Sequence, residues 1–365
     1  MDKTLAWLWL ADAVGSACQN ARDLLALYPD PEALYEALCA GREAPPYFLS
    51  DHAVAQLCDT TPFDYEERLD HCLLTGVEII TPDDAAYPDR LRDLPDMPLV
   101  LYVTGEPACL NGHRYVGMVG TRRPSAYGRQ AAFDLSLEMA KQGAVIVSGL
   151  ADGLDSEGHR AAVEAGTPTV AFLGTAIDTT YPAANVKLRQ RIEKGGAVCS
   201  EYPPGYQGKQ KGTFLARNRL IAGLSEVLCV AEARIRSGTL NTVSHAESLG
   251  RPVLAVPGSI YSAQSQGTNE LLRSGRAGVL CQAADVLACM GVESESAAPE
   301  QSAFAVEQTS PDAQAVYAAL GPTPKGVDEL AAATGLSASR VLAACTELEL
   351  YGGAQSQPGR RYVAL

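Results

Sequence analysis

The first 75 residues show only the apolar spacing of helices. Apolar side chains recur every three or four positions through residues 5–14, 21–27, 33–38 and 54–57, with prolines and glycines between these stretches. This spacing is typical of helices that bury one face. Two strand-like runs, at 77–80 and 99–103, lie in a segment that we expect to connect the helices to the next domain. We predict a small helical domain over residues 1–75.

Residues 111–290 alternate between apolar runs of strand length and segments of helix length. The runs lie at 115–119, 144–147, 169–173, 197–199, 227–230 and 252–256. The predicted helices lie at 127–142, 153–166, 185–194, 215–224, 239–249 and 268–274. Runs this apolar indicate a sheet that is covered on both faces. We therefore predict an α/β fold with a doubly wound, parallel, Rossmann-like sheet, and assign residues 76–290 to it.

The end of the chain begins with a segment of little periodicity. It is rich in Glu, Ser, Ala and Gln, and we predict a linker over residues 291–310. Three predicted helices follow, at 312–320, 327–334 and 337–350, and then a glycine-containing strand pair that ends at residue 365. Three helices and a hairpin form the pattern of a winged helix, which we assign to residues 311–365.

The charge is unevenly distributed along the chain. The net charge is −14, but residues 1–110 carry −14, residues 111–290 carry +5 and residues 291–365 carry −5. A site for a polyanion such as nucleic acid is therefore expected in the middle segment.

Several protein classes are disfavoured. No apolar run approaches the ~18 residues of a membrane span. The stretch Leu5–Ala11 is bracketed by Asp2 and Asp12, which favours an amphipathic first helix over a secretory signal. The ten cysteines include no CxxC pair, and several, such as Cys229, lie in apolar runs. We expect buried, reduced thiols in a cytoplasmic protein without zinc.

The turn after the run at 115–119 has the residues of an anion-binding loop. Gly120 allows a tight turn, and the hydroxyls of Thr121 and Ser125 lie near the start of the next helix. Arg122 and Arg123 add positive charge suited to phosphate. The alternative is an N-capped surface loop with solvated arginines.

The turn after the run at 144–147 contains three glycines. Ser148 and Gly149 begin it, and such glycines imply the close approach of a ligand or of another part of the chain. Asp155 and His159 follow, but we interpret Asp155 as a helix cap and His159 as packed under the loop, not as catalytic or metal-binding groups.

The most informative stretch runs from Lys209 to Ser225. It combines Lys209 and Lys211 with an aromatic ring, Phe214, and then Arg217-Asn218-Arg219. Cations follow the phosphates of a single strand and an aromatic face stacks on its bases. The alternative is that Phe214 belongs to the core and the cations are solvated.

A second candidate phosphate-binding turn follows the run at 227–230. Arg234 and Arg236 precede Ser237, Gly238 and Thr239, which begin the next predicted helix.

Nucleotide-cofactor motifs are missing. Neither G-x-G-x-x-G nor a Walker loop is present, so we expect no nucleotide cofactor. With the cysteine spacing and the interpretation of Asp155 and His159 given above, we also expect no metal and no catalytic residues.

These segments together resemble one family, the bacterial DNA-processing protein A family (DprA, also called Smf). The matching segments are in family order and include Val116–Arg122, Ser148–Asp155, Tyr181-Pro182, Ser200–Pro203, Arg217–Ser225, Ser237–Leu240, Val256–Gly258 and Gly267–Asn269. Leu215, Gly158 and Arg276 depart from the common family pattern.

The resemblance implies a helical, SAM-like N-terminal domain and an extended Rossmann-like domain that binds single-stranded DNA. It implies a homodimer formed through that domain, and a protein that protects incoming strands in natural transformation and loads RecA recombinase onto them. Residues that match DNA-contacting positions are Arg122, Lys211, Phe214, Arg217 and Asn218, with Gly120, Thr121, Ser148 and Gly149 on the adjoining loops.

Two questions stay open at this point. The alternative function is that of Rossmann-like, nucleotide-cleaving phosphoribohydrolases, but the nearest segment, Ser237–Glu247, lacks their double glycine and has its glutamate at the wrong spacing. The third helix of the winged helix carries a single cation, Arg340, against Glu347 and Glu349. This favours a protein contact over a weak accessory DNA contact.

Overall fold

The computed structural model describes residues 2–41, 47–208, 210–291, 309–321, 324–357 and 359–364, with the backbone alone at 210 and 211. The chain divides into two compact units, residues 1–293 and residues 294–365. The predicted linker, 291–310, lies almost wholly outside the described residues. The predicted division into three domains stays a prediction.

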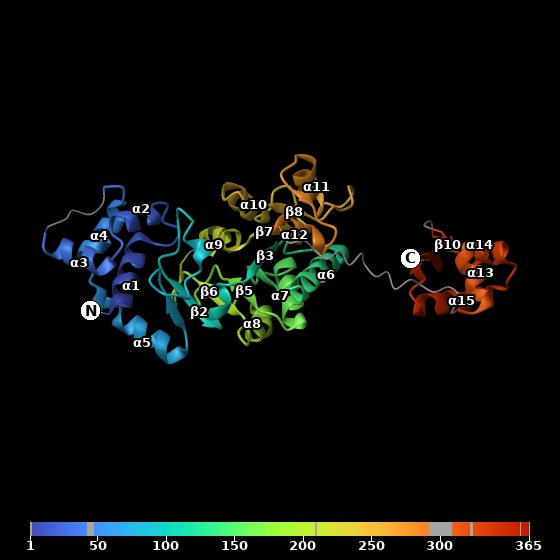
Figure 1. The fold of residues 1–365 in the computed structure, drawn as a ribbon, viewed down its shortest axis with the longest axis horizontal. Coiled ribbons are helices and arrows are strands. Elements are labelled where there is room, and N and C mark those ends of the chain that lie inside the picture. Colours follow the sequence, from blue (N-terminus) through green and yellow to red (C-terminus); the bar gives the residue numbers. More distant parts are fainter. Residues whose placement is uncertain are drawn as a thin grey trace. The chain divides into compact units, whose positions relative to one another are not determined.

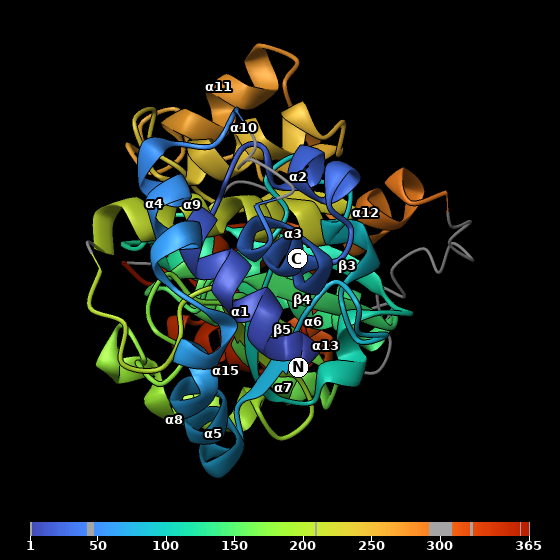
Figure 2. The same ribbon diagram turned by 90° about the vertical axis from the view of Figure 1, so that its left-hand side faces the viewer.

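The first unit begins with five helices gathered at one edge of the sheet (Figures 1 and 2): α1 (Lys3–Val14), α2 (Ala21–Leu27), α3 (Pro31–Cys39), α4 (Asp51–Asp59) and α5 (Glu66–Thr75). The expected amphipathic first helix is wrong, because all six residues from Leu5 to Leu10 are buried. Two tryptophans keep their indole N–H groups bonded inside: Trp7 donates to Asp83 (2.9 Å) and Trp9 to the Thr60 carbonyl (3.2 Å).

The predicted Rossmann-like sheet is confirmed, but it is mixed rather than wholly parallel. Its order is β1-β2-β6-β5-β4-β3-β7-β8-β9, and β1 and β2 run antiparallel at one edge. These two strands are the runs that we expected in a connector. The bounds are β1 Glu78–Ile80, β2 Leu101–Gly105, β3 Arg114–Val119, β4 Ala144–Ser148, β5 Thr169–Phe172, β6 Ala197–Ser200, β7 Val227–Val230, β8 Val253–Ala255 and β9 Gly278–Val279.

Helices cover both faces of the sheet (Figure 1). The crossovers from β3 to β6 place α6, α7 and α8 on one face, and the return through α9 and α10 covers the other face. Strand order reverses between β3 and β7, the position at which such sheets hold ligands. The bounds are α6 Ala126–Lys141, α7 Leu154–Ala165, α8 Val186–Ile192, α9 Gln210–Leu224, α10 Thr239–Ser248, α11 Gln266–Arg273 and α12 Ala283–Cys289.

Alternation along β3 shows how the sheet separates two apolar layers. Val116 and Met118 pack in the layer with α6, α7 and α12, whereas Tyr115 and Val119 belong to the layer with α9. The second layer is continuous with the buried face of α1, so the N-terminal helices and the sheet share one core. Burial of this kind on both faces holds the strand ends, and therefore their loops, in fixed positions.

The second unit is a winged helix, as predicted. It contains α13 (Pro311–Ala319), β10 (Lys325–Gly326), α14 (Val327–Thr334), α15 (Ala338–Leu350), β11 (Ala354–Gln357) and β12 (Arg361–Ala364). The three strands form a sheet in the order β10-β12-β11.

All ten cysteines are described and free, but not all are buried as expected. Cys39, Cys58, Cys281 and Cys289 are exposed because they lie near helix ends or in a surface turn, outside the apolar runs.

Candidate nucleic-acid interface

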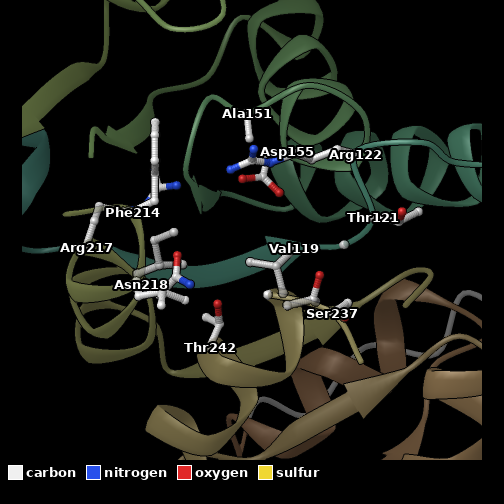
Figure 3. Close-up of a pocket in the computed structure, with 15 residues that line it drawn as sticks. Val119, Thr121, Arg122, Ala151, Asp155, Phe214, Arg217, Asn218, Ser237 and Thr242 are labelled. Atoms are coloured by element: carbon white, nitrogen blue, oxygen red, sulfur yellow. The ribbon is translucent and has the colours of Figure 1, made fainter. Parts of the chain in front are cut away.

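A pocket of about 350 Å³ opens where the strand order reverses (Figure 3). Its walls come from the turn after β3, the loop before α7, the first half of α9 and the start of α10. The lining residues are Val119, Gly120, Thr121, Arg122, Ala151, Asp155, Phe214, Leu215, Arg217, Asn218, Ile221, Ser237, Gly238, Thr239 and Thr242.

The turn after β3 is held in place by hydrogen bonds that leave Arg122 free. The Thr121 N–H donates to the Glu232 carbonyl (2.8 Å), and the Ser125 hydroxyl donates to the Glu232 carboxylate (2.6 Å) and caps α6. Arg122 is exposed, and no described residue forms an ion pair with it. Its guanidinium carbon lies 5.4 Å from the centroid of the Phe214 ring, a cation–π distance.

Phe214 stands in the pocket wall on α9 (Figure 3). The ring contacts Gly174, where a Cβ atom would lie 2.5 Å from Phe214 Cδ1, so only glycine leaves room for this ring. The neighbouring Thr213 hydroxyl donates to the Gly174 carbonyl (2.5 Å) and fixes the start of α9 against this loop. A ring held this way presents an aromatic face without the entropy cost of ordering a mobile side chain.

Arg217 lies beneath this ring and is only 3% exposed. Its guanidinium donates to the carbonyls of Gly149 (2.6 Å) and Phe172. Burial lowers the pKa of Arg217 to about 10, and the nearby Asp155 carboxylate opposes this effect. Arg217 therefore remains charged at neutral pH. The glycine-rich turn predicts the close approach of a ligand or of another part of the chain, and at Gly149 the approaching group is the Arg217 side chain.

Asp155 and Arg122 lie at the same end of the pocket (Figure 3). Asp155 does not cap α7 as expected: Gly153 precedes the helix, and Asp155 lies in its first turn and accepts the Gly149 N–H (3.2 Å). Burial raises the pKa of Asp155, and the charges of Arg217 and Arg122 oppose the rise. This carboxylate balances the cations beneath the pocket.

His159 is fully buried under the same loop, where the sequence places it. Its Nδ1 lies 2.8 Å from the Thr169 hydroxyl, and burial lowers the pKa of His159 to about 3. The imidazole is neutral at pH 7. The described residues hold no group of three or more His, Cys, Asp or Glu side chains placed for a metal ion.

The opposite wall is polar and comes from α9 and α10. The Asn218 amide donates to Asn241 (3.1 Å), and Thr242 lies one turn after Thr239 on the same face of α10. The Ser237 hydroxyl oxygen is buried, and it has no hydrogen-bond partner among the described residues. The helix α10 begins at Thr239, within this wall.

The structure brings nine of the predicted residues to the pocket: Gly120, Thr121, Arg122, Phe214, Arg217, Asn218, Ser237, Gly238 and Thr239. Arg123 is exposed but outside it, Ser125 caps α6, and the Ser148 hydroxyl is buried against the Met118 carbonyl (2.6 Å). The Lys211 side chain lies outside the described residues.

Arg219 is a correction to the predicted set. It is 1% exposed and forms ion pairs with Glu201 (2.6 Å) and Asp96 (3.2 Å). Two carboxylates enclose the Arg219 guanidinium, so this side chain cannot bind single-stranded DNA. Moving it to the DNA would leave two buried carboxylates without a cation. The sequence does not separate it from Arg217, two positions away.

The sequence missed two polar pocket residues, Asp155 as a lining group and Thr242. The spacing of Thr239 and Thr242, three residues apart at a helix start, is a signal that could have found the second. Asp155 could not be found in this way, because its place in the pocket depends on the buried Arg217 beside it.

The family model described as DNA recombination-mediator protein A matches residues 78–291. The chain belongs to this family. A second family model, for a DprA winged helix domain, matches residues 297–360. A relative from Mycobacterium tuberculosis is 38% identical over 80% of this chain and 79% of its own length.

Two solved structures of the family resemble this fold. DNA processing protein A from Streptococcus pneumoniae is 32% identical, with a TM-score of 0.64 over 79% of this chain and 98% of that one. The protein from Helicobacter pylori, whose structure concerns its single-stranded DNA binding mode, is 33% identical, with a TM-score of 0.53 over 58% of this chain and 95% of that one. Within the described residues, no helix combines the length and apolar character needed to cross a membrane.

Proposed function

We propose that this protein binds single-stranded DNA non-specifically in the pocket at the end of β3 and β7. The observation that carries the proposal is the unpaired cation Arg122 against the Phe214 ring in a pocket at the point where strand order reverses. The H. pylori relative, which binds single-stranded DNA, supports it.

The chemistry fits an unpaired strand. Arg122, and Lys211 by its place in the sequence, would neutralise phosphates, while the Phe214 face would stack on a base of any identity. The polar wall of Asn218, Ser237 and Thr239 offers few base-edge contacts, so little sequence preference is expected.

The deciding experiment is binding of fluorescent dT20, and of a mixed-sequence 20-mer, at two salt concentrations. We expect similar affinity for both, weaker binding of a duplex of the same length, and a steep fall in affinity with salt. The proposal would be overturned if the protein does not bind at low salt, or if its affinity does not change with salt concentration.

The role in the cell that we propose is that of a mediator. The protein would act in the cytoplasm as a homodimer formed through its α/β domain. It would protect the strand and load RecA recombinase onto it during natural transformation or homologous recombination. RecA filament growth on strands pre-covered by a single-strand binding protein tests the loading, and light scattering tests the dimer. A monomer at micromolar concentration would count against it.

The alternative function, nucleotide cleavage by a phosphoribohydrolase-type enzyme, finds no support in the site. Glu247, the glutamate that would serve it, is held by Arg276 through two bonds of 2.7 Å and does not line the pocket. Release of free base from nucleoside monophosphates would favour this alternative.

A further inference from the structure

Three cations without ion pairs among the described residues lie on α8 and in the turn that follows it. Lys187 and Arg191 are exposed on α8, and Lys194 is exposed in the turn that follows. Within the described part of the chain, none of the three side chains forms a hydrogen bond or an ion pair. Such a cluster is notable in a chain whose net charge is −14.

The local structure turns these cations outward on one side. Lys187 and Arg191 are one helical turn apart, so they share a face of α8. Arg189, between them, is buried and donates to the Ile177 carbonyl (2.6 Å) and to Glu193 (2.8 Å). The nearest carboxylate along the chain, Glu193, is therefore already paired with Arg189.

The segment that precedes α8 is anchored to the pocket. The Asn185 amide donates to the Leu150 carbonyl and to the Ser156 hydroxyl, both at 2.9 Å, which ties this segment to the loop before α7. The Tyr181 ring, 46% exposed, lies 5.5 Å from the Phe214 ring. An aromatic surface thus leads from Phe214 toward the start of α8.

The pocket alone is too small for a whole binding site. Single-strand binding surfaces of comparable domains cover about 4–16 nucleotides, whereas this pocket encloses about 350 Å³. A strand must leave the pocket across the protein surface, and the route with unpaired cations lowers its free energy most.

A second route from Phe214, past Tyr206, is less favourable. Tyr206 stacks on Tyr202 (4.7 Å) and borders a cleft with the N-terminal helices. The cleft's cation, Arg68, is already paired with Asp12 (3.1 Å), and residues 1–110 carry −14. Phosphates would be repelled along this route.

We propose that a strand leaving the pocket passes Tyr181 and follows the cationic face formed by Lys187, Arg191 and Lys194. This inference rests on the proposed function, because it extends the same binding site. It assigns to α8 the role of a phosphate-binding surface that lengthens the footprint on single-stranded DNA.

The test compares two double variants with the same charge change. Lys187→Gln/Arg191→Gln removes the cationic face. Arg114→Gln/Lys141→Gln removes an exposed Arg and Lys that have no ion pair within the described ranges and lie where β3 and β4 begin. For dT20, the first variant should lower the log–log salt slope by up to about 1.4, since each phosphate contact contributes about 0.7. The control variant should bind dT20 as wild type does.

The outcomes separate this inference from the function on which it rests. If Lys187→Gln/Arg191→Gln binds dT20 with the wild-type slope, the route along α8 is wrong and the pocket stands. If Tyr206→Ala weakens dT20 binding instead, the strand takes the route past Tyr206. If wild type does not bind dT20, the proposed function itself fails. A wild-type circular dichroism spectrum for each variant shows that folding is intact.

Discussion

The pocket at the strand ends and the winged helix each carry an arginine without an ion pair among the described residues, Arg122 and Arg360. Arg122 lies against an aromatic ring in a pocket, whereas Arg360 lies exposed in the wing. In the winged helix, Arg340 on α15 is bound by Asp312 through bonds of 2.7 and 2.5 Å, and Arg361 donates to the Pro324 carbonyl (2.9 Å).

The difference shows that DNA binding depends more on whether each cation is already paired than on how many cations a surface carries. An exposed arginine held by a carboxylate must give up that pair before it binds a phosphate, so its net gain is small. An unpaired arginine releases counterions from the DNA at no such cost. We propose that the winged helix, in a segment of charge −5 and with Arg340 and Arg361 already bonded, is better suited to a protein partner than to DNA.

The largest effect is expected from Arg219, the buried arginine of α9. Arg219→Met leaves Glu201 and Asp96 buried without their cation, which should lower the free energy of unfolding by about 3–5 kcal/mol. Denaturant unfolding followed by tryptophan fluorescence measures it, because both tryptophans, Trp7 and Trp9, lie in the first unit.

The matched variant in the winged helix is Arg340→Met. Because this arginine is exposed, its loss should leave the thermal transition of the winged helix, followed by circular dichroism, unchanged. Equal losses from Arg219→Met and Arg340→Met would contradict the distinction between enclosed and surface ion pairs.

The second largest effect is a pH dependence of stability, which we expect in the first unit and not in the winged helix. His159 is neutral in the folded protein because its pKa is lowered to about 3, whereas the unfolded chain protonates near 6.5. Its contribution to stability is complete above pH 6.5 and declines as pH falls toward 3. Between pH 6.5 and 4.5 the loss should be about 2–3 kcal/mol.

His159→Gln removes this dependence. The variant should lose about 2–3 kcal/mol less than wild type over the same pH interval, measured by denaturant unfolding with tryptophan fluorescence. The winged helix contains no histidine, so its transition should show no such contribution. Parallel pH profiles for variant and wild type would show that His159 titrates normally in the folded state.

Sequence reasoning found the type of fold and most of the pocket, and its errors have physical causes. Strand ends could be located because apolar runs stop abruptly, which placed Gly120, Arg122 and Ser237 at one rim. The sequence could not show that β2 pairs antiparallel with β6, because strand direction depends on contacts distant along the chain. Nor could it separate Arg217 from Arg219, since their burial depends on Asp155, Glu201 and Asp96 in three other segments.

The third effect is on DNA binding, and it distinguishes the contribution of stacking on Phe214 from that of the charge of Arg122. Phe214→Ala should weaken dT20 binding by about 1–3 kcal/mol, or about fivefold to 150-fold, without changing the salt slope. Arg122→Ala should lower the slope by about 0.7. The matched aromatic control is Tyr351→Ala in the winged helix, an exposed ring that should not affect binding. A changed slope in Phe214→Ala would mean that the ring orders a cation rather than stacking on a base.

The smallest effect is expected from Arg340→Ala, measured as dT20 binding by the full chain. The two bonds to Asp312 already satisfy this guanidinium, so a phosphate would only replace a carboxylate. Affinity and salt slope should therefore equal those of wild type. A slope lower by about 0.7 would show that Arg340 leaves Asp312 for the strand. In that case pairing in the free protein does not decide which arginines bind DNA, and the same test would have to be applied to Arg361 in the wing.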